Sequence, residues 1–417
     1  NRLKEKNNVI VSLFVHGWNH GSRIDDSDLH NFQYTLNDLY NQKNLQGKPV
    51  KNIGIYIGWR DRTLPKSLNY ATFWSRKNIS VNIGKGDLGA FILDLERVVK
   101  HEESNHQGSL ILSGHSFGAS ALYHALGPIL ISRFQDSITQ QQTLRGVGDL
   151  IVLINPAIEA KQFLPLRETI WRHASKEASN APHIFKDNLY PFFVVLGSNG
   201  DFAVNNLFPA GRWLNTANDK YDRTSIINGN AQACTTKSCH TQKVKYCKVG
   251  EDCLIPENLL DRHAIGNFPW FHTHWLTSDQ PKPSLIESSI QNTSKILQKS
   301  LSVKNTNEAA ARCTHSDRDW LNSTIQGKHD NNWETNIATL GDGAVLKLST
   351  RFIEDNWKNF GLNQRKEPQA TTTSQSTTWN RNPYWFVRVN GKVIPDHSEI
   401  WNQQVGCFIL SITKLDH

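Results

Sequence analysis

The sequence predicts an α/β fold in which a mainly parallel sheet is flanked by helices. Two observations carry this prediction. Over the first 205 of the 417 residues, short apolar runs of strand length alternate with stretches of helical spacing, as in sheets whose crossovers are helices. The runs end in glycine-rich or polar loops, and open α/β sheets bind ligands at the carboxyl ends of their strands.

The domain organisation follows from where this alternation weakens. We expect a core at residues 1–205, an insertion or cap at 206–382, and the last strand, a histidine-bearing loop and a closing helix of the core at 383–417. The insertion contains a cysteine cluster and a low-complexity stretch at 369–378 that predicts a flexible loop. The length suits one enlarged domain with a large insertion before the last strand and helix.

The first elements are predicted to be a strand, a helix and a strand. Val9–Val15 is a β-branched apolar run that ends at His16-Gly17-Trp18, and Ile53–Ile57 is a second run that ends at Gly58. Between them, apolar residues recur at helical spacing behind a group of aspartates, which suits a capped helix N-terminus. These apolar residues are Leu29, Phe32, Leu36 and Leu39.

The third strand, Ser109–Leu112, leads into Gly114-His115-Ser116-Phe117-Gly118 and then into an alanine-rich helix. A serine hydroxyl becomes a good nucleophile only when a base removes its proton and a carbonyl can reach it. Small residues on both sides of Ser116 allow the tight strand-to-helix turn that presents such a hydroxyl above a sheet. We therefore expect Ser116 to be a nucleophile, and a glycine-rich structural turn is the alternative.

An oxyanion hole and an acid are expected at other strand ends. The residue after a nucleophile normally supplies one N–H donor to the hole, which here is Phe117, and the turn after the first strand places the N–H of Trp18 for the second. Asp201 follows the strand Phe192–Leu196, which itself follows Leu150–Ile154, and is the expected acid. A turn aspartate and an ordinary turn with a packed tryptophan are the alternatives.

Two histidines compete for the role of base. His397 follows the strand-like Tyr384–Val389 and precedes a helix expected within Ile400–Leu415, and the last strand-to-helix loop is where the base belongs. His263 is the alternative. We expect the Asn390-Gly391 pair to turn a hairpin into a further strand at 392–394.

The other histidines are predicted to pack or to hydrogen-bond: His16, His115, His272 and His274. A metal site at His272-Thr273-His274 would need further ligands that the sequence does not place.

Four of the six cysteines lie in one window, at Cys234, Cys239, Cys247 and Cys253, whereas Cys313 and Cys407 stand apart. Such crowding predicts disulfide stapling of a loop and favours a secreted or periplasmic protein. The spacing fits no common zinc module. Zinc binding and free thiols in the cytoplasm are the alternatives.

The net charge of +8 and the isoelectric point near 9.1 favour peripheral contact with an anionic membrane, although a solvated basic surface is the commoner explanation. No nucleic-acid-binding motif is present, and no apolar run is long enough to span a bilayer.

Several motifs resemble the α/β-hydrolase superfamily, and within it a group of bacterial lipases and esterases. The matching segments, which cover about half the chain, are Phe14–Trp18, Gly58–Arg60, Ser113–Ala119, Leu153–Ala157, and Asp201 followed by Phe208–Arg212. The resemblance implies a triad of Ser116, Asp201 and a histidine, with Trp18 and Phe117 as oxyanion donors, and no cofactor. Ala264–His274 also resembles that group, which keeps His263 as an alternative base.

Together these features predict hydrolysis of a carboxylic ester, with an acyl lipid or a phospholipid as the expected substrate, through an acyl-enzyme. Aromatic residues of the insertion would line an acyl pocket or form a hydrophobic core, and these are Phe268, Trp270, Phe271 and Trp275. The alternatives are a catalytically inactive binding protein with the same fold and a basic, disulfide-stapled envelope-binding protein. The sequence does not predict the oligomeric state.

Overall fold

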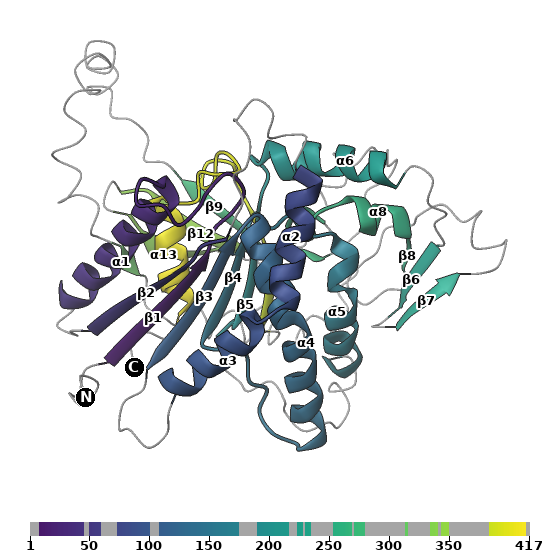
Figure 1. The fold of residues 1–417 in the computed structure, drawn as a ribbon, viewed down its shortest axis with the longest axis horizontal. Coiled ribbons are helices and arrows are strands. Elements are labelled where there is room, and N and C mark those ends of the chain that lie inside the picture. The colour runs from purple at the N-terminus through teal and green to yellow at the C-terminus, as the bar shows by residue number, and fades with distance from the viewer. Residues whose placement is uncertain are drawn as a thin grey trace, which may run out of the picture.

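The computed structural model describes most of the core and part of the insertion (Figure 1). The described residues are 8–45, 50–59, 73–100, 108–174, 190–216, 223–227, 230–234, 253–268, 271–279, 313–315, 334–340, 343–349 and 383–413. A 10-stranded sheet in the order β10-β11-β12-β9-β13-β5-β4-β3-β1-β2 organises them. The expected α/β fold is therefore confirmed at the level of a mostly parallel sheet flanked by helices.

The parallel part of the sheet runs from β9 to β2, and each of its neighbouring pairs is parallel. Its strands are β1 (Asn8–Val15), β2 (Val50–Ile57), β3 (Ser109–His115), β4 (Leu150–Ile154), β5 (Phe193–Ser198), β9 (His274–Asp279) and β13 (Tyr384–Val389). Because these strands share one direction, their carboxyl ends meet at a single edge of the sheet.

Helices cover both faces of this sheet. They are α1 (Ser27–Leu45), α2 (Phe73–Lys85), α3 (Leu88–Val99), α4 (Phe117–Thr139), α5 (Ala160–Ala174), α6 (Phe208–Asn215), α8 (Glu257–Arg262) and α13 (Gln403–Ile412), with a short π-helix at Ala203–Leu207. One face packs against α3, α4 and α5, and the other packs against α1 and α13. The sequence did not predict α2, α3 or α5.

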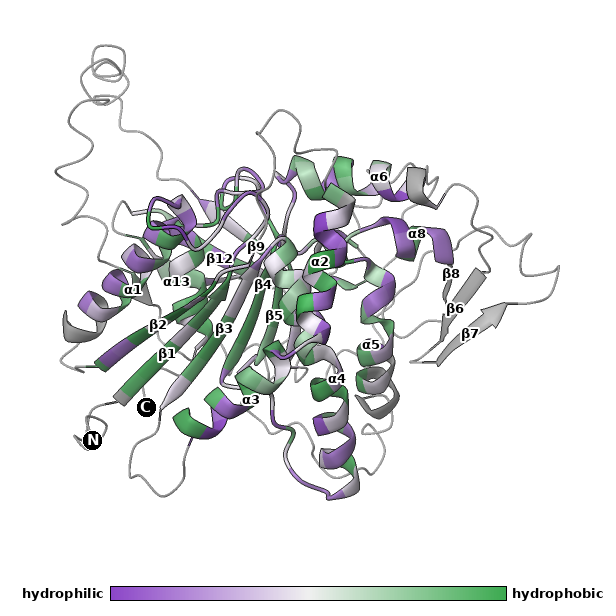
Figure 2. Ribbon diagram, in the orientation of Figure 1, coloured by the Kyte–Doolittle hydropathy of each residue, from purple (hydrophilic) through white to green (hydrophobic). Residues whose placement is uncertain are grey.

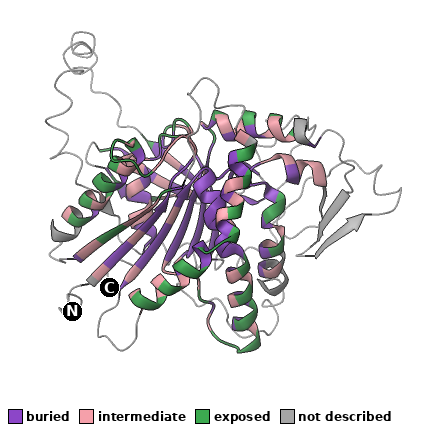
Figure 3. Cartoon of the chain, viewed as in Figure 1, coloured by how far each residue is buried: buried purple, intermediate pink, exposed green. Residues whose placement is uncertain are grey.

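Alternation along the central strands fits burial on both faces. In β5, Phe193 and Val195 belong to the core cluster under α4 and α5, whereas Val194 and Leu196 belong to the cluster under α13. The central strands are accordingly hydrophobic almost throughout (Figure 2), and the residues buried from solvent concentrate in them (Figure 3).

Part of the expected insertion extends the sheet. Strands β10 (Thr314–His315), β11 (Glu334–Thr339) and β12 (Val345–Ser349) add to β9 in antiparallel fashion. The described part of 206–382 is therefore not a separate cap throughout, because these strands continue the core sheet. Strands β6 (Arg223–Ile227), β7 (Asn230–Cys234) and β8 (Cys253–Pro256) form a second, 3-stranded sheet.

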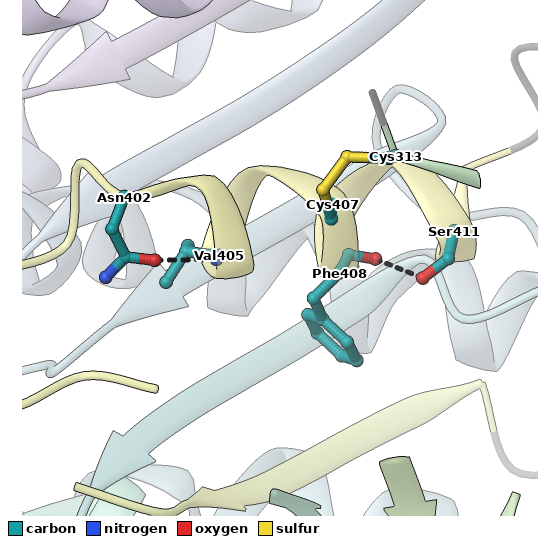
Figure 4. The surroundings of a disulfide bond; sticks show 6 residues. All are labelled: Cys313, Asn402, Val405, Cys407, Phe408 and Ser411. Atoms are coloured by element: carbon teal, nitrogen blue, oxygen red, sulfur yellow. Dashed lines mark hydrogen bonds between the residues drawn. A yellow bond between two sulfur atoms is a disulfide. The ribbon is translucent and has the colours of Figure 1, made fainter. Parts of the chain in front are cut away.

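A disulfide joins the sheet extension to the closing helix. Cys313, just before β10, bonds to Cys407 of α13, and their Cα atoms are 5.8 Å apart (Figure 4). A bond between these two cysteines was not predicted from the sequence. The predicted stapling among the other four cysteines involves side chains outside those that the structure describes, as do the low-complexity loop at 369–378 and Trp270.

The predicted hairpin at Asn390-Gly391 is wrong. The N–H groups of Val393 and Ile394 both donate to the Asn390 carbonyl, at 2.8 and 3.2 Å, and the Asn390 side chain accepts from the N–H of Lys392. The chain therefore coils into successive turns after β13 instead of returning as a strand. None of the described helices has the length and apolar character needed to cross a membrane.

Candidate active site

The turn after β3 forces Ser116 into an unusual backbone conformation. Ser116 has φ of 53° and ψ of −114°, a region that non-glycine residues rarely occupy. Its N–H donates to the Ile154 carbonyl at 3.0 Å, and its own carbonyl accepts from the N–H groups of Ser120 and Ala157. These bonds fix the sharp bend between the strand and α4.

The structure brings Ser116, His397 and Asp201 together. Nε2 of His397 lies 2.8 Å from Oγ of Ser116, and Nδ1 of His397 lies 2.6 Å from Oδ2 of Asp201. Ser116 and Asp201 are buried, whereas the His397 side chain is 19% exposed. The imidazole is thus placed to take the proton of the Ser116 hydroxyl while the carboxylate holds its other nitrogen.

Asp201 follows β5 and is fully buried. Its Oδ1 accepts from the N–H of Val204 at 2.9 Å, which leaves Oδ2 directed at His397. Burial lowers the pKa of the nearby Arg388 to about 10, and the interaction with the Asp201 carboxylate opposes that shift. Because an ionised carboxylate only accepts hydrogen bonds, Nδ1 of His397 carries a proton and Nε2 is free to accept one.

The ring of His263, the alternative base, makes a hydrogen bond within its own segment. Its Nδ1 donates to the Leu259 carbonyl at 2.9 Å, within the last turn of α8. Burial lowers its pKa, which is the ordinary behaviour of a structural histidine. The geometry therefore favours His397.

The turn expected to supply the second oxyanion donor lies beside Ser116. A Cβ on Gly17 would be 3.2 Å from Cβ of Ser116 and 2.6 Å from Nδ1 of His115, so only glycine fits there without displacing its neighbours. A Cβ on Gly118 would overlap the carbonyl oxygens of Val15 and His16. These close approaches bring the turn carrying Trp18 against the first turn of α4, whose N–H groups lack intrahelical acceptors.

Aromatic rings pack around this turn. The rings of Trp18 and Phe117 each contact Phe73 of α2, with centroids 5.3 and 4.9 Å apart. Phe268 and Phe271 instead belong to the main core, where both are almost fully buried. Of the two roles left open for the insertion aromatics, the structure assigns these two to the core.

His16 connects the turn after β1 to the residues that follow β2. Its ring stacks on Trp59, and its Nε2 accepts from the backbone N–H of that residue at 3.0 Å. Its Nδ1 donates to the Gly17 carbonyl, and burial lowers its pKa. His16 is thus a neutral packing and hydrogen-bonding residue, as predicted.

A buried network of four charged side chains lies where α2, α5, α6 and α8 meet. Lys77 pairs with Glu159, and Arg212 contacts Glu159 at 3.2 Å and both oxygens of Asp261 at 2.7 and 2.8 Å. Burial lowers the pKa of Lys77, which its partner Glu159 opposes. This network could not be predicted from the sequence, because its members are far apart along the chain.

The pair His272 and His274 makes contacts within the protein. Nε2 of His272 donates to the Gly266 carbonyl at 3.0 Å, and Nδ1 of His274 lies 2.7 Å from Oγ1 of Thr273. Over the residues that the structure describes, no group of three or more potential ligands is arranged to hold a metal.

Comparison with protein-family models and with curated proteins finds no match for this chain.

Proposed function

We propose that this protein is a serine hydrolase of the α/β-hydrolase type that cleaves carboxylic esters. The observation that carries the proposal is the continuous hydrogen-bonded chain from Ser116 Oγ through His397 to Asp201. His397 takes the proton as Ser116 attacks the ester carbonyl, and returns it to the leaving alkoxide. Water then attacks the acyl-enzyme, with His397 again taking a proton and returning it to the leaving Ser116.

The N–H groups of Trp18 and Phe117 would hold the oxyanion formed in each step. The helix α4 begins at Phe117, and a helix N-terminus favours the negative charge that develops there. The tight packing of Gly17 on Ser116 is what allows a second backbone donor to approach the same point.

An apolar acyl substrate is the class that the surroundings favour. The partly exposed rings of Trp18 and Phe73 lie over the buried ring of Phe117, which directly follows the nucleophile. Close to the acid, Phe202, Leu207 and Trp213 are 61%, 45% and 54% exposed, and exposed apolar side chains near a site suit contact with lipid. We therefore propose fatty-acyl esters, including phospholipids, as substrates.

Labelling by a fluorophosphonate probe tests the nucleophile. Wild-type protein should be labelled, Ser116→Ala should not, and the matched Ser113→Ala, three residues earlier, should be labelled as wild type. His397→Ala should slow labelling by about 10⁴-fold, whereas folded His263→Ala should keep the wild-type rate. Labelling of Ser116→Ala would refute the assignment.

Turnover separates the enzyme from its alternatives. p-Nitrophenyl esters of increasing acyl length and phospholipid vesicles should be hydrolysed by wild type and not by Ser116→Ala. Folded wild-type protein that is inert to the probe and to every ester, yet binds vesicles, would instead support an envelope-binding protein or an inactive hydrolase scaffold.

A further inference from the structure

We propose that His115 and Asn155 are positioning residues that jointly hold the backbone carbonyl of His397, and so aim its imidazole at Ser116. The inference rests on the proposed function and adds two residues to it. His397 lies in the irregular loop between β13 and α13, where no helix or strand fixes its direction.

The first donor comes from the nucleophile's own turn. Nε2 of His115 lies 2.8 Å from the carbonyl oxygen of His397, and the two rings are 4.9 Å apart. A carbonyl only accepts hydrogen bonds, so Nε2 of His115 must carry the proton. His115 directly precedes Ser116, and thus one turn of chain carries both the nucleophile and a tether for the base.

Burial keeps this tether uncharged. His115 is 2% exposed, and burial together with the neighbouring His397 lowers its pKa well below the ordinary value. A neutral ring matters here, because a second cation beside His397 would oppose the protonation that the base undergoes during acyl transfer. His16 and His20 act on His115 in the same direction, and the His397 carbonyl acts in the opposite one.

The second donor links the base to the strand that leads to the acid. Nδ2 of Asn155 lies 3.1 Å from the same His397 carbonyl, and its Oδ1 accepts from the N–H of Ser198 at 3.0 Å. Since Oδ1 is already used by Ser198, the amide orientation is fixed with Nδ2 toward His397. Ser198 is the last residue of β5, three residues before Asp201.

Asn155 also adopts a backbone conformation that suits few residues. Its φ is 44°, in the left-handed region where asparagine and aspartate are enriched. Both lone pairs of the His397 carbonyl are thus used by side chains from the ends of β3 and β4. The backbone carbonyl of His397 is thus bonded to the ends of β3 and β4, while its ring bonds to Ser116 and Asp201.

Paired substitutions of His115 test this inference. His115→Leu removes the donor and keeps an apolar side chain, whereas His115→Gln keeps a donor near the position of Nε2. Asn155→Asp keeps the shape of the side chain, and aspartate tolerates the positive φ at this position. The variant places an oxygen where the Nδ2 donor faced the His397 carbonyl. His272→Leu is the matched control, because it removes another buried Nε2 donor to a backbone carbonyl. The ester kcat and KM are measured for each.

We expect His115→Leu and Asn155→Asp to lose about 10-fold to 100-fold in kcat with KM within about twofold of wild type, as for a misdirected base. His115→Gln should recover most of that loss, and His272→Leu should keep the wild-type kcat. A wild-type kcat in His115→Leu, or an equal loss in the Leu and Gln variants, would overturn the role of His115. A wild-type kcat in Asn155→Asp would overturn that of Asn155.

Proton NMR gives a second readout that does not need turnover. The downfield signal of the His397 Nδ1 proton, bonded to Asp201, should be sharp in wild type, His115→Gln and His272→Leu, and broadened or lost in His115→Leu. If wild type neither reacts with the probe nor hydrolyses esters, the proposed function fails, and this signal alone still decides the positioning role. An unchanged signal in His115→Leu would overturn it.

Discussion

The hydrogen bond from the Val204 N–H to Asp201 determines which ring nitrogen of His397 carries the proton. Because the Val204 N–H occupies Oδ1, the remaining oxygen must face Nδ1 of the imidazole. An amide at position 201 would keep its oxygen on Val204 and turn its NH₂ toward His397. Nδ1 would then have to accept, and the proton would move to Nε2, where it would face Ser116.

Asp201→Asn should therefore lower kcat by about 10⁴-fold while leaving KM nearly unchanged, because the base would hold the wrong tautomer. Steady-state kinetics on a p-nitrophenyl ester measures this. Asp149→Asn is the control, since Asp149 also accepts from one backbone N–H and one side-chain nitrogen, Nζ of Lys100, but lies before β4, at the opposite end of the strands. Less than a tenfold loss for Asp201→Asn would contradict the assigned role.

The residues at this site were predictable to different degrees. Ser116 and Asp201 lie within three residues of the ends of short strands, so their position at the carboxyl edge could be inferred from local sequence. The sequence favoured His397 over His263 from its place after the last strand, but its contact with Ser116 depends on how a distant segment packs. The roles of His115 and Asn155 are both set by contacts with residue 397, more than 240 positions away.

At the scale of elements, three interactions hold the closing helix α13 in place. Asn402 caps its N-terminus by accepting from the N–H of Val405 at 2.9 Å, and Phe408 is buried against the sheet. Cys407, next to Phe408, bonds to Cys313 at the far edge of the sheet (Figure 4). The disulfide closes a loop with a sequence separation of 94 residues.

Removing this disulfide should lower the stability of the protein. The double variant Cys313→Ala/Cys407→Ala should unfold in urea with a free energy about 2–4 kcal/mol lower than wild type, because the unfolded chain regains the freedom that the cross-link removes. The comparison is made without reductant. An unchanged unfolding midpoint would show that the two cysteines are not bonded in solution.

Helices and strands were predictable where the periodicity of apolar residues was clear within the segment itself. The strands β1 to β5 and the helices α1, α4 and α13 were found in this way. The strands β11 and β12 were missed, since antiparallel pairing with β9 depends on contacts outside their own short segments. At Asn390-Gly391 the turn residues were recognised, but the asparagine side chain stabilised a coiled turn instead of a hairpin.

For the whole molecule, the buried histidines make stability depend on pH. Burial lowers the pKa of both His272 and His274 to about 3, from an ordinary value of 6.5. Between these two pH values the unfolded chain binds protons that the folded protein excludes. Stability is therefore fully present above pH 6.5 and falls as the pH decreases toward 3.

Urea unfolding at pH 7 and pH 5 measures this effect. His272→Gln, which keeps a donor for the Gly266 carbonyl but does not titrate, should reduce the difference in unfolding free energy between the two pH values by about 2 kcal/mol. Exposed His30 provides the control, and His30→Gln should leave the difference unchanged. An equal difference in wild type and His272→Gln would mean that His272 is accessible to protons in the folded state.

The sequence distance between Ser116 and His397, the proposed nucleophile and base, has a consequence for synthesis in the cell. Residue 397 follows residue 116 by 281 positions, which a ribosome needs roughly 15–60 s to add at about 5–20 residues per second. Throughout that interval the nascent chain contains Ser116 but lacks His397, the base of the proposed mechanism. By the proposed mechanism, the polypeptide therefore cannot hydrolyse esters until nearly all of the described chain has been translated.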